Sequence, residues 1–328
     1  MNRVIGEKVL VVAELSANHN QNKQVAIDTI KAAKYAGADA VKLQTYSADT
    51  MTINCDNEFF RIGGGTPWEW HEELFNLAKS EGLLCFSTPF DKTAVDFLEE
   101  IGNPIYKIAS FEITDIPLIS YVASKGKPVI MSTGISNLDD IKLAVNTCKE
   151  AGNNDILLLK CTSSYPAPIK EANLLTIPDM RKRFGVEVGL SDHTIGPEAA
   201  ITAVSLGARV IEKHFILDRK MGGPDSSFSV EPEEFKTLIE MIRKVESALG
   251  EVTYEIPTAA LGNRKFSRSL FAVEDIESGE LFTVKNIRSI RPGDGLHPKL
   301  LNEIIGRPAA TRIRRGTPLN EKMVNWST

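Results

Sequence analysis

The stretch KVLVVAELSANHNQNKQVAIDTIKAAKYAGADAVKLQ, residues 8–44, decides the fold. It begins with a short, β-rich apolar run at 8–14 that ends in Glu14. An amphipathic, helix-like pattern follows at 26–37 and ends in a glycine, and a second β-rich run occupies 40–44. A strand, a helix and a strand in this order predict two parallel strands, because the helix returns the chain to the starting edge of the sheet.

The same order of elements recurs along the first four-fifths of the chain. Further helix-like patterns lie at 93–102 and 139–152. Eight repeats of strand and helix favour a (β/α)₈ TIM barrel over a doubly wound sheet, which usually has fewer strands. The eight predicted strands are 8–14, 40–44, 84–88, 105–110, 128–133, 156–162, 187–192 and 209–214.

The repeat stops after a long helical pattern at 231–249. We therefore expect a barrel domain at 1–250, a linker at 251–265 that contains a proline and a glycine, and a small second domain at 266–328. Such a short tail is too small to carry a large core alone. It contains ten Lys or Arg and seven Asp or Glu, a net charge of +3 against −8 for the rest. This asymmetry is consistent with docking on a barrel or approach to an anion.

Composition narrows the class of protein. The 328 residues are 42% hydrophobic and 25% charged, as in a globular chain, and the net charge of −5 argues against a nucleic-acid partner. The four cysteines form no C-x-x-C pair, which favours reduced thiols and a cytoplasmic location. The apolar run at 9–13 is too short for a signal peptide or a membrane span, so we expect no membrane partner.

Polar residues stand at the predicted strand ends, which meet at one open face of a parallel barrel. Lys42 and Lys107 lie in otherwise β-like segments, where a buried ammonium needs an anionic partner. The hydroxyls of Thr88, Ser110, Ser132 and Ser191 are further donors for one anion. This set of donors suits a phosphate or a carboxylate, although each residue alone could simply cap its strand.

Two histidines, His193 and His214, end neighbouring strands and could share one divalent ion with a carboxylate and waters. The alternative is a pair of hydrogen-bonded polar strand ends. His19, in the loop after the first strand, is expected to face the same opening. His71, with Trp68 and Trp70, is assigned to packing or to the surface.

Several motifs together resemble the sialic acid synthase family, and they cover essentially the whole chain in order. They are AELSANHN (13–20), VKLQTY (41–46), STPFD (87–91), YKIASFE (106–112), STGIS (132–136), KCTSSYP (160–166), GLSDHTIG (189–196), EKHF (212–215), GGPDSSFSVEPEEF (222–235), RSL (268–270) and SIRPGDGL (289–296). Within the family, ELSANH (14–19), TPWEWH (66–71) and GLHP (295–298) are most similar to members that act on 2,4-diacetamido-2,4,6-trideoxy-L-altrose.

The resemblance implies a TIM barrel followed by an antifreeze-like (SAF, β-clip) domain, in a homodimer that exchanges its C-terminal domains. It also implies condensation of phosphoenolpyruvate with an open-chain amino sugar, which gives a nine-carbon 2-keto acid and inorganic phosphate. A divalent metal, Mn²⁺, Mg²⁺ or Co²⁺, is the implied cofactor, held by His193 and His214.

The family's functional residues match positions of this chain. Glu112 or Glu14 is expected to act as base or to steer water. Ser163 replaces an asparagine that is common in sialic acid synthases. Arg291 is expected to reach the partner subunit's sugar site, and Phe228 and Trp68 are candidate apolar contacts of the sugar. The resemblance assigns phosphoenolpyruvate to Lys42, Thr88, Lys107, Ser110, Ser132, Ser163 and Ser191, and the sugar to Glu14, Gln44, Tyr165 and Asp225.

Three other functions remain open from the residues. The first is the same chemistry on another amino sugar, as in N-acetylneuraminate or legionaminate synthases. The second is a metal-dependent aldolase that uses pyruvate and releases no phosphate. The third is a noncatalytic carbohydrate- or ice-binding protein, against which the 17 charged residues of the tail argue.

Overall fold

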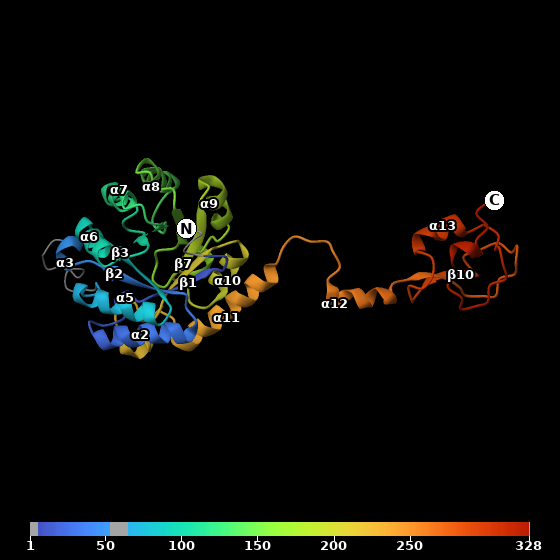
Figure 1. Ribbon diagram of the computed structural model, residues 1–328, viewed down its shortest axis with the longest axis horizontal. Helices are drawn as coiled ribbons and strands as arrows, with labels where there is room; N and C mark the ends of the chain where they lie inside the picture. Colours follow the sequence, from blue (N-terminus) through green and yellow to red (C-terminus); the bar gives the residue numbers. More distant parts are fainter. Residues whose placement is uncertain (1–5, 53–64, 328) are drawn as a thin grey trace. The chain divides into compact units, whose positions relative to one another are not determined.

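The computed structural model describes residues 6–52 and 65–327. Its first compact unit, residues 1–250, contains a closed barrel of eight parallel strands in sequence order, which confirms the predicted TIM barrel (Figure 1). The fourth strand is shorter than the expected 105–110 because a turn begins at Ala109. The strands are β1 (Leu10–Glu14), β2 (Ala40–Thr45), β3 (Leu84–Pro89), β4 (Tyr106–Ile108), β5 (Val129–Ser132), β6 (Ile156–Cys161), β7 (Glu187–Asp192) and β8 (Val210–His214).

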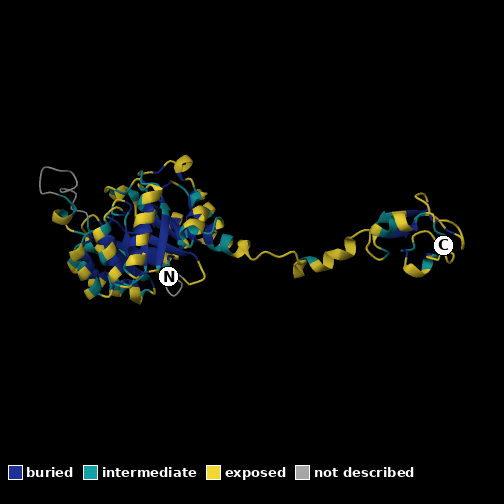
Figure 2. Cartoon of the chain, turned by 90° about the horizontal axis from the view of Figure 1, so that it is seen from above, coloured by how far each residue is buried: buried dark blue, intermediate teal, exposed yellow. Residues whose placement is uncertain are grey.

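Helices surround the barrel, and their outer faces are exposed while the strands are buried (Figure 2). Side-chain caps fix where several of them begin: Asn22, Asp91 and Asn137 each accept hydrogen bonds from first-turn backbone N–H groups. The helices are α2 (Lys23–Ala36), α3 (Ala48–Met51), α5 (His71–Ser80), α6 (Lys92–Glu100), α7 (Ile116–Ser124), α8 (Leu138–Glu150), α9 (Thr176–Phe184), α10 (Glu198–Ser205) and α11 (Pro232–Leu249).

The interior of the barrel has an apolar layer and a polar layer. Side chains alternate between the two faces of each strand, so every second residue points inward. The apolar layer consists of Leu10, Val12, Ala40, Phe86, Ile105, Ile130, Leu157, Leu159 and Val210. One or two inward positions further along the strands, the buried residues are Glu14, Lys42, Thr88, Lys107, Ser132, Ser191 and Glu212. Six of the predicted site residues therefore share one end of the barrel.

The second compact unit, residues 251–328, is described by itself. It contains a two-stranded antiparallel sheet of β9 (Ser269–Ala272) and β10 (Ile287–Ile290), with the short helices α12 (Thr258–Leu261) and α13 (Leu301–Ile304). Despite its size it has an apolar core of its own. Fully buried members of that core include Leu270, Ile276, Phe282 and Ile304.

No helix in the described part of the chain is long and apolar enough to cross a membrane. Cys85, Cys148 and Cys161 are buried free thiols, whereas Cys55 lies outside the described residues. His71 is buried among the surrounding helices, where its Nε2 lies 2.7 Å from Thr45 Oγ1.

A buried ion pair joins the ends of β7 and β8. Lys213 Nζ lies 2.7 Å from Asp192 Oδ2 and also donates to the backbone oxygen of Thr194 at 2.6 Å. Both charged side chains are 1% exposed. Each is the immediate neighbour of a histidine, His193 or His214, so this pair fixes the two strand ends that carry the histidines.

Lys213→Met is expected to lower the free energy of unfolding by ~3–5 kcal/mol, because it leaves a buried carboxylate without its countercharge. Denaturant unfolding monitored by circular dichroism measures the loss. The matched control is Arg183→Met, which breaks the half-exposed Asp179–Arg183 pair of α9 and should cost less than ~1 kcal/mol. Equal losses in the two variants would contradict the structural role of the buried pair.

Candidate active site

Two lysines and two glutamates form a buried charge cluster inside the barrel. Lys42 Nζ lies 2.6 Å from Glu14 Oε2 and 3.7 Å from Glu212 Oε2. Lys107 Nζ lies 3.3 Å from Glu212 Oε1. Glu212 therefore bridges the two lysines, and the sequence-based expectation that each lysine needs an anionic partner is met by the chain's own carboxylates.

Burial and the neighbouring charges shift the pKa values of three members of this cluster. Burial alone would raise the pKa of Glu212, but the charges of Lys107 and Lys42 outweigh it and hold that pKa below its ordinary value. Burial opposes the charged form of Lys42 as well, yet Glu14 and Glu212 raise its pKa. For Lys107 burial prevails and lowers the pKa, with Glu212 offsetting part of the effect.

Hydroxyl groups surround the charges. Thr88 Oγ1 accepts from Lys42 Nζ at 3.2 Å, and Ser191 Oγ donates to Glu212 Oε1 at 3.1 Å. The buried Ser132 Oγ has no hydrogen-bond partner among the described residues. Ser110 Oγ accepts from the backbone N–H of Gly134 at 3.0 Å, and the Ser110 side chain also hydrogen-bonds to Cys161.

Gly134 permits the close approach of three further side chains. A Cβ at this position would lie 2.1 Å from Ser163 Oγ and 2.9 Å from both Cys161 Sγ and Ser110 Oγ. Any larger residue would therefore displace the hydroxyls. The structure thus brings Ser163, the serine in place of the family's common asparagine, close to Ser110 and Cys161.

The two histidines lie side by side at the end of the barrel interior. The ring centroids of His193 and His214 are 5.2 Å apart. His193 Nδ1 lies 3.0 Å from the backbone oxygen of Thr162, an arrangement in which Nδ1–H donates and Nε2 keeps its lone pair. His214 Nδ1 has no hydrogen-bond partner among the described residues and lies 3.5 Å from Asp225 Oδ2.

This donor set fits a divalent ion with open coordination positions. With metal–nitrogen bonds of ~2 Å, two imidazoles at this separation can reach one ion. No three His, Cys, Asp or Glu side chains within residues 6–52 and 65–327 are grouped to hold an ion by themselves, so water or substrate would complete the shell. His19 does not join the pair: its ring packs edge-on against Trp70, and burial lowers its pKa to about 4.

Aromatic rings enclose the histidines. Tyr165 lies 4.5 Å from His193, and Phe228 lies 5.0 Å from His214, measured between ring centroids. Phe228 thus lies beside the histidine pair. Trp68 instead stacks on Phe97 of α6, which assigns it to packing among the helices.

Three residues that are expected to meet the sugar, Glu14, Gln44 and Asp225, are linked by hydrogen bonds beside the histidine pair. Gln44 Nε2 donates to Glu14 Oε1 at 2.8 Å and to Ser16 Oγ at 3.1 Å. Ser16 Oγ donates to Asp225 Oδ2. Although burial favours the neutral acid, the nearby His214 and the hydrogen bond from Ser16 lower the pKa of Asp225 below its ordinary value.

Glu112, in the turn after β4, differs from the other carboxylates. Its Oε2 is buried without a hydrogen-bond partner in the described part of the chain. Burial raises its pKa to about 7, and the charge of Lys107 offsets only part of that effect. A carboxyl group with this pKa can exchange a proton near neutral pH, which suits a general base.

The sequence gives no site role to three residues that the structure places here. Glu212 stands with His214 among the polar strand ends, and because it is two residues before His214 it points to the same face of β8. Ser16 and Cys161 carried no sequence signal of their own. Cys161 ends β6 with Sγ 3.7 Å from His193 Nδ1; burial opposes its thiolate, but His193 lowers its pKa to about 7. Arg291 lies exposed in the second compact unit.

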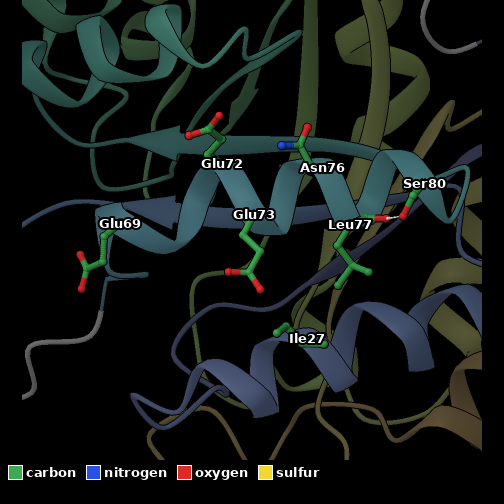
Figure 3. A pocket seen from close by; sticks show the side chains of 7 residues that line it. All are labelled: Ile27, Glu69, Glu72, Glu73, Asn76, Leu77 and Ser80. Carbon is green, nitrogen blue, oxygen red and sulfur yellow. Dashed lines mark hydrogen bonds between the residues drawn. The ribbon is translucent and has the colours of Figure 1, made fainter.

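A cavity of about 610 Å³ lies outside the barrel, between α2 and α5 (Figure 3). Glu69, Glu72 and Glu73 line it, and Lys23 pairs with Glu73. It contains neither the hydroxyls nor the histidines of the barrel interior, so we do not assign the chemistry to it. A second cavity of about 600 Å³ borders Phe228 between the loops after β7 and β8.

Comparison with known proteins assigns a family to each compact unit. Residues 29–254 match the NeuB family and residues 267–325 match the SAF domain. A pseudaminic acid synthase from Campylobacter jejuni (strain 81-176) is 46% identical over 330 residues, 96% of each chain. An N,N'-diacetyllegionaminic acid synthase from C. jejuni (strain NCTC 11168) is 36% identical over 333 residues, 96% of this chain and 100% of the other.

A solved structure is also similar. The crystal structure of an N-acetylneuraminic acid (sialic acid) synthetase from Leptospira borgpetersenii has a TM-score of 0.74 and 31% identity, and the match covers 78% of this chain and 90% of the other. A TIM barrel whose mouth holds lysines, hydroxyls and a histidine pair, followed by an SAF domain, defines the class. The chain belongs to the NeuB family.

The raised pKa of Glu112 predicts a pH-dependent stability. The folded protein keeps this proton up to about pH 7, whereas an unfolded glutamate releases it near 4.5, so the stabilisation is present at low pH and lost as pH rises through 7. Glu112→Gln should remove this loss of roughly 2–3 kcal/mol between pH 5 and 8. Urea unfolding of both proteins across this range measures it. Glu171→Gln, at an exposed glutamate, is the control, and parallel wild-type and Glu112→Gln profiles would refute the assignment.

Proposed function

We propose that this protein condenses phosphoenolpyruvate with 2,4-diacetamido-2,4,6-trideoxy-L-altrose to give pseudaminic acid and phosphate. The observation that carries the proposal is the polar layer inside the barrel, two lysines amid hydroxyls beside a histidine pair, in a chain 46% identical to a pseudaminic acid synthase. The synthase is thus a phosphoenolpyruvate-dependent transferase that forms a carbon–carbon bond.

The lysines and hydroxyls supply the donors that a phosphorylated carboxylate requires. We assign the anion to Lys42 and Lys107 because charge-assisted hydrogen bonds are the strong ones. Before substrate binds, Glu14 and Glu212 neutralise these lysines, so the substrate anion must compete with the carboxylates for the ammonium protons. The proposed set also includes the hydroxyls of Thr88, Ser110, Ser132, Ser163 and Ser191, of which Ser132 Oγ has no partner among the described residues.

His193 and His214 would hold the divalent metal, Mn²⁺, Mg²⁺ or Co²⁺. When bound, such an ion supplies Lewis-acid polarisation of a sugar carbonyl. The backbone oxygen of Thr162 keeps Nδ1 of His193 protonated, so its Nε2 lone pair is the one available as ligand. Asp225 lies close enough to His214 to orient its ring.

The reaction joins C3 of phosphoenolpyruvate to the aldehyde carbon of the sugar, and water adds to C2. The tetrahedral carbon then expels phosphate, which leaves the 2-keto acid. We propose Glu112 as the base that takes the proton of the attacking water, because its pKa near 7 gives it both a carboxylate fraction and basicity at neutral pH. Glu14, by contrast, is already bound by Lys42 and Gln44, which leaves it the role of a positioning and sugar-facing group.

The proposal predicts phosphate release from phosphoenolpyruvate only when a suitable sugar is added. In a panel of 2-acetamido and 2,4-diacetamido hexoses, kcat/KM should be highest for 2,4-diacetamido-2,4,6-trideoxy-L-altrose, because a site with fixed acceptors penalises sugars with unmatched donors. Exhaustive chelation should abolish turnover and Mn²⁺ should restore it.

Other outcomes of this panel separate the alternatives. Higher efficiency with N-acetylmannosamine or the legionaminic acid precursor would change the sugar and leave the reaction class standing. Condensation with pyruvate without phosphate release would indicate an aldolase. Thermal hysteresis without turnover would indicate an ice-binding protein. Undiminished turnover after chelation would refute the metal site.

We further propose a cytoplasmic homodimer in which each SAF domain serves the partner's barrel. Three buried free thiols support a reducing compartment, and the family resemblance supports the exchanged arrangement. Arg291 lies exposed on a loop with Pro292, Gly293 and Gly295, a tight turn that can project one long cation. Its proposed target is the sugar site of the other subunit.

Mixed dimers test this exchange. Arg291→Ala and His214→Ala should each be nearly inactive alone. Co-expressed with two different affinity tags, they should give mixed dimers with partly restored phosphate release, because the barrel with intact His214 receives an intact Arg291 from its partner. No recovery in dimers shown to be mixed would refute the exchanged role of Arg291.

A further inference from the structure

Ser16, two residues after β1, has a backbone conformation that is unfavourable for any residue with a side chain. Its φ is +46°, in the left-handed region that favours glycine. Ser16 is nevertheless 4% exposed and well placed for hydrogen bonds. Strain of this kind is retained where the side chain has a role that glycine cannot supply.

The hydroxyl of Ser16 joins two segments that are far apart in the sequence. It donates its single proton to Asp225 Oδ2, in the loop after β8. It accepts from Gln44 Nε2 of β2 at 3.1 Å. Because a hydroxyl has one donor and two acceptor sites, this pattern fixes the direction of both bonds.

The same contact fixes the amide of Gln44. Its Nε2 donates to Glu14 Oε1 and to Ser16 Oγ, which uses both amide protons. Gln44 Oε1 receives no hydrogen bond from any residue in the described part of the chain. The arrangement therefore leaves acceptors, Gln44 Oε1 and a carboxylate oxygen of Asp225, for a ligand that brings N–H and O–H donors.

We propose that Ser16 is a positioning residue that determines sugar specificity. This rests on the proposed function, in which Gln44 and Asp225 face the amino sugar. Ser16 itself holds these two groups at a fixed spacing, and the acetamido N–H and hydroxyl groups of a 2,4-diacetamido sugar are the donors that match them. Without the hydroxyl, Gln44 can rotate its amide and Asp225 loses a donor, so the spacing no longer selects one sugar.

Ser16→Gly separates this role from folding. Glycine suits a positive φ, so the melting temperature should be unchanged or higher. KM for the sugar should rise about tenfold or more, while KM for phosphoenolpyruvate stays within about twofold. The ratio of kcat/KM between the 2,4-diacetamido sugar and N-acetylmannosamine should fall by about tenfold. Ser16→Ala, which also lacks the hydroxyl but keeps the strain, should show the same change in specificity.

Asn173→Gly is the matched control. Asn173 has the same φ of +46° in the loop after β6, and its exposed side chain donates only to the backbone oxygen of Glu171. It should gain stability without any change in sugar selection. Unchanged sugar KM and sugar ratio in both Ser16 variants would overturn the proposal, as would an equal rise in KM for phosphoenolpyruvate.

Failure of the proposed function is a distinct result. If the wild type turns over another amino sugar better than the 2,4-diacetamido one, the altrose assignment is wrong. The role of Ser16 is then judged by the same ratio, taken between that preferred sugar and its nearest competitor in the panel. A preserved ratio overturns the role, and a tenfold loss supports it.

Discussion

The active site depends on the bridge that Glu212 makes between Lys42 and Lys107 inside the barrel. Two ammonium groups buried this closely would repel each other and lose hydration, so they require a carboxylate between them. Glu14 binds the far side of Lys42 and completes a cluster of two positive and two negative charges. The barrel can thus bury cationic binding groups while no ligand is bound.

The pairing of the lysines with carboxylates also limits what the site can bind. A substrate anion must compete with Glu14 and Glu212 for hydrogen bonds from the two ammonium groups, so hydroxyl and backbone donors must add to its binding. The buried hydroxyl of Ser132, which has no partner among the described residues, can donate a hydrogen bond in this way. Glu112, by contrast, lies where the charge of Lys107 offsets only part of the effect of burial, and its raised pKa is the result. Two glutamates of one site, Glu112 and Glu212, therefore have pKa values shifted in opposite directions.

Two positions without a long side chain determine the geometry of the site. Gly134 admits three side chains into a space that one Cβ would fill. Ser16 accepts an unfavourable φ and links β2 to the loop after β8. At both positions the residue type is set by the groups that it allows to meet, which lie on other strands. The Lys213–Asp192 ion pair also positions the site, because it holds together the two strand ends that carry the histidines.

The sequence by itself determined the barrel, the position of all eight strands and the end at which the polar residues gather, because strand periodicity and parallel order fix these without long-range information. Family motifs added the residue types at that end. Only the tertiary structure decided the pairings. Glu212 lies between two lysines, and Ser16 lies between Gln44 and Asp225, so residues from different repeats meet. Burial, which raises the pKa of Glu112, likewise depends on the elements packed around it. The packing of His19 against Trp70 and of Trp68 against Phe97 is also a tertiary contact, which no local sequence pattern predicts.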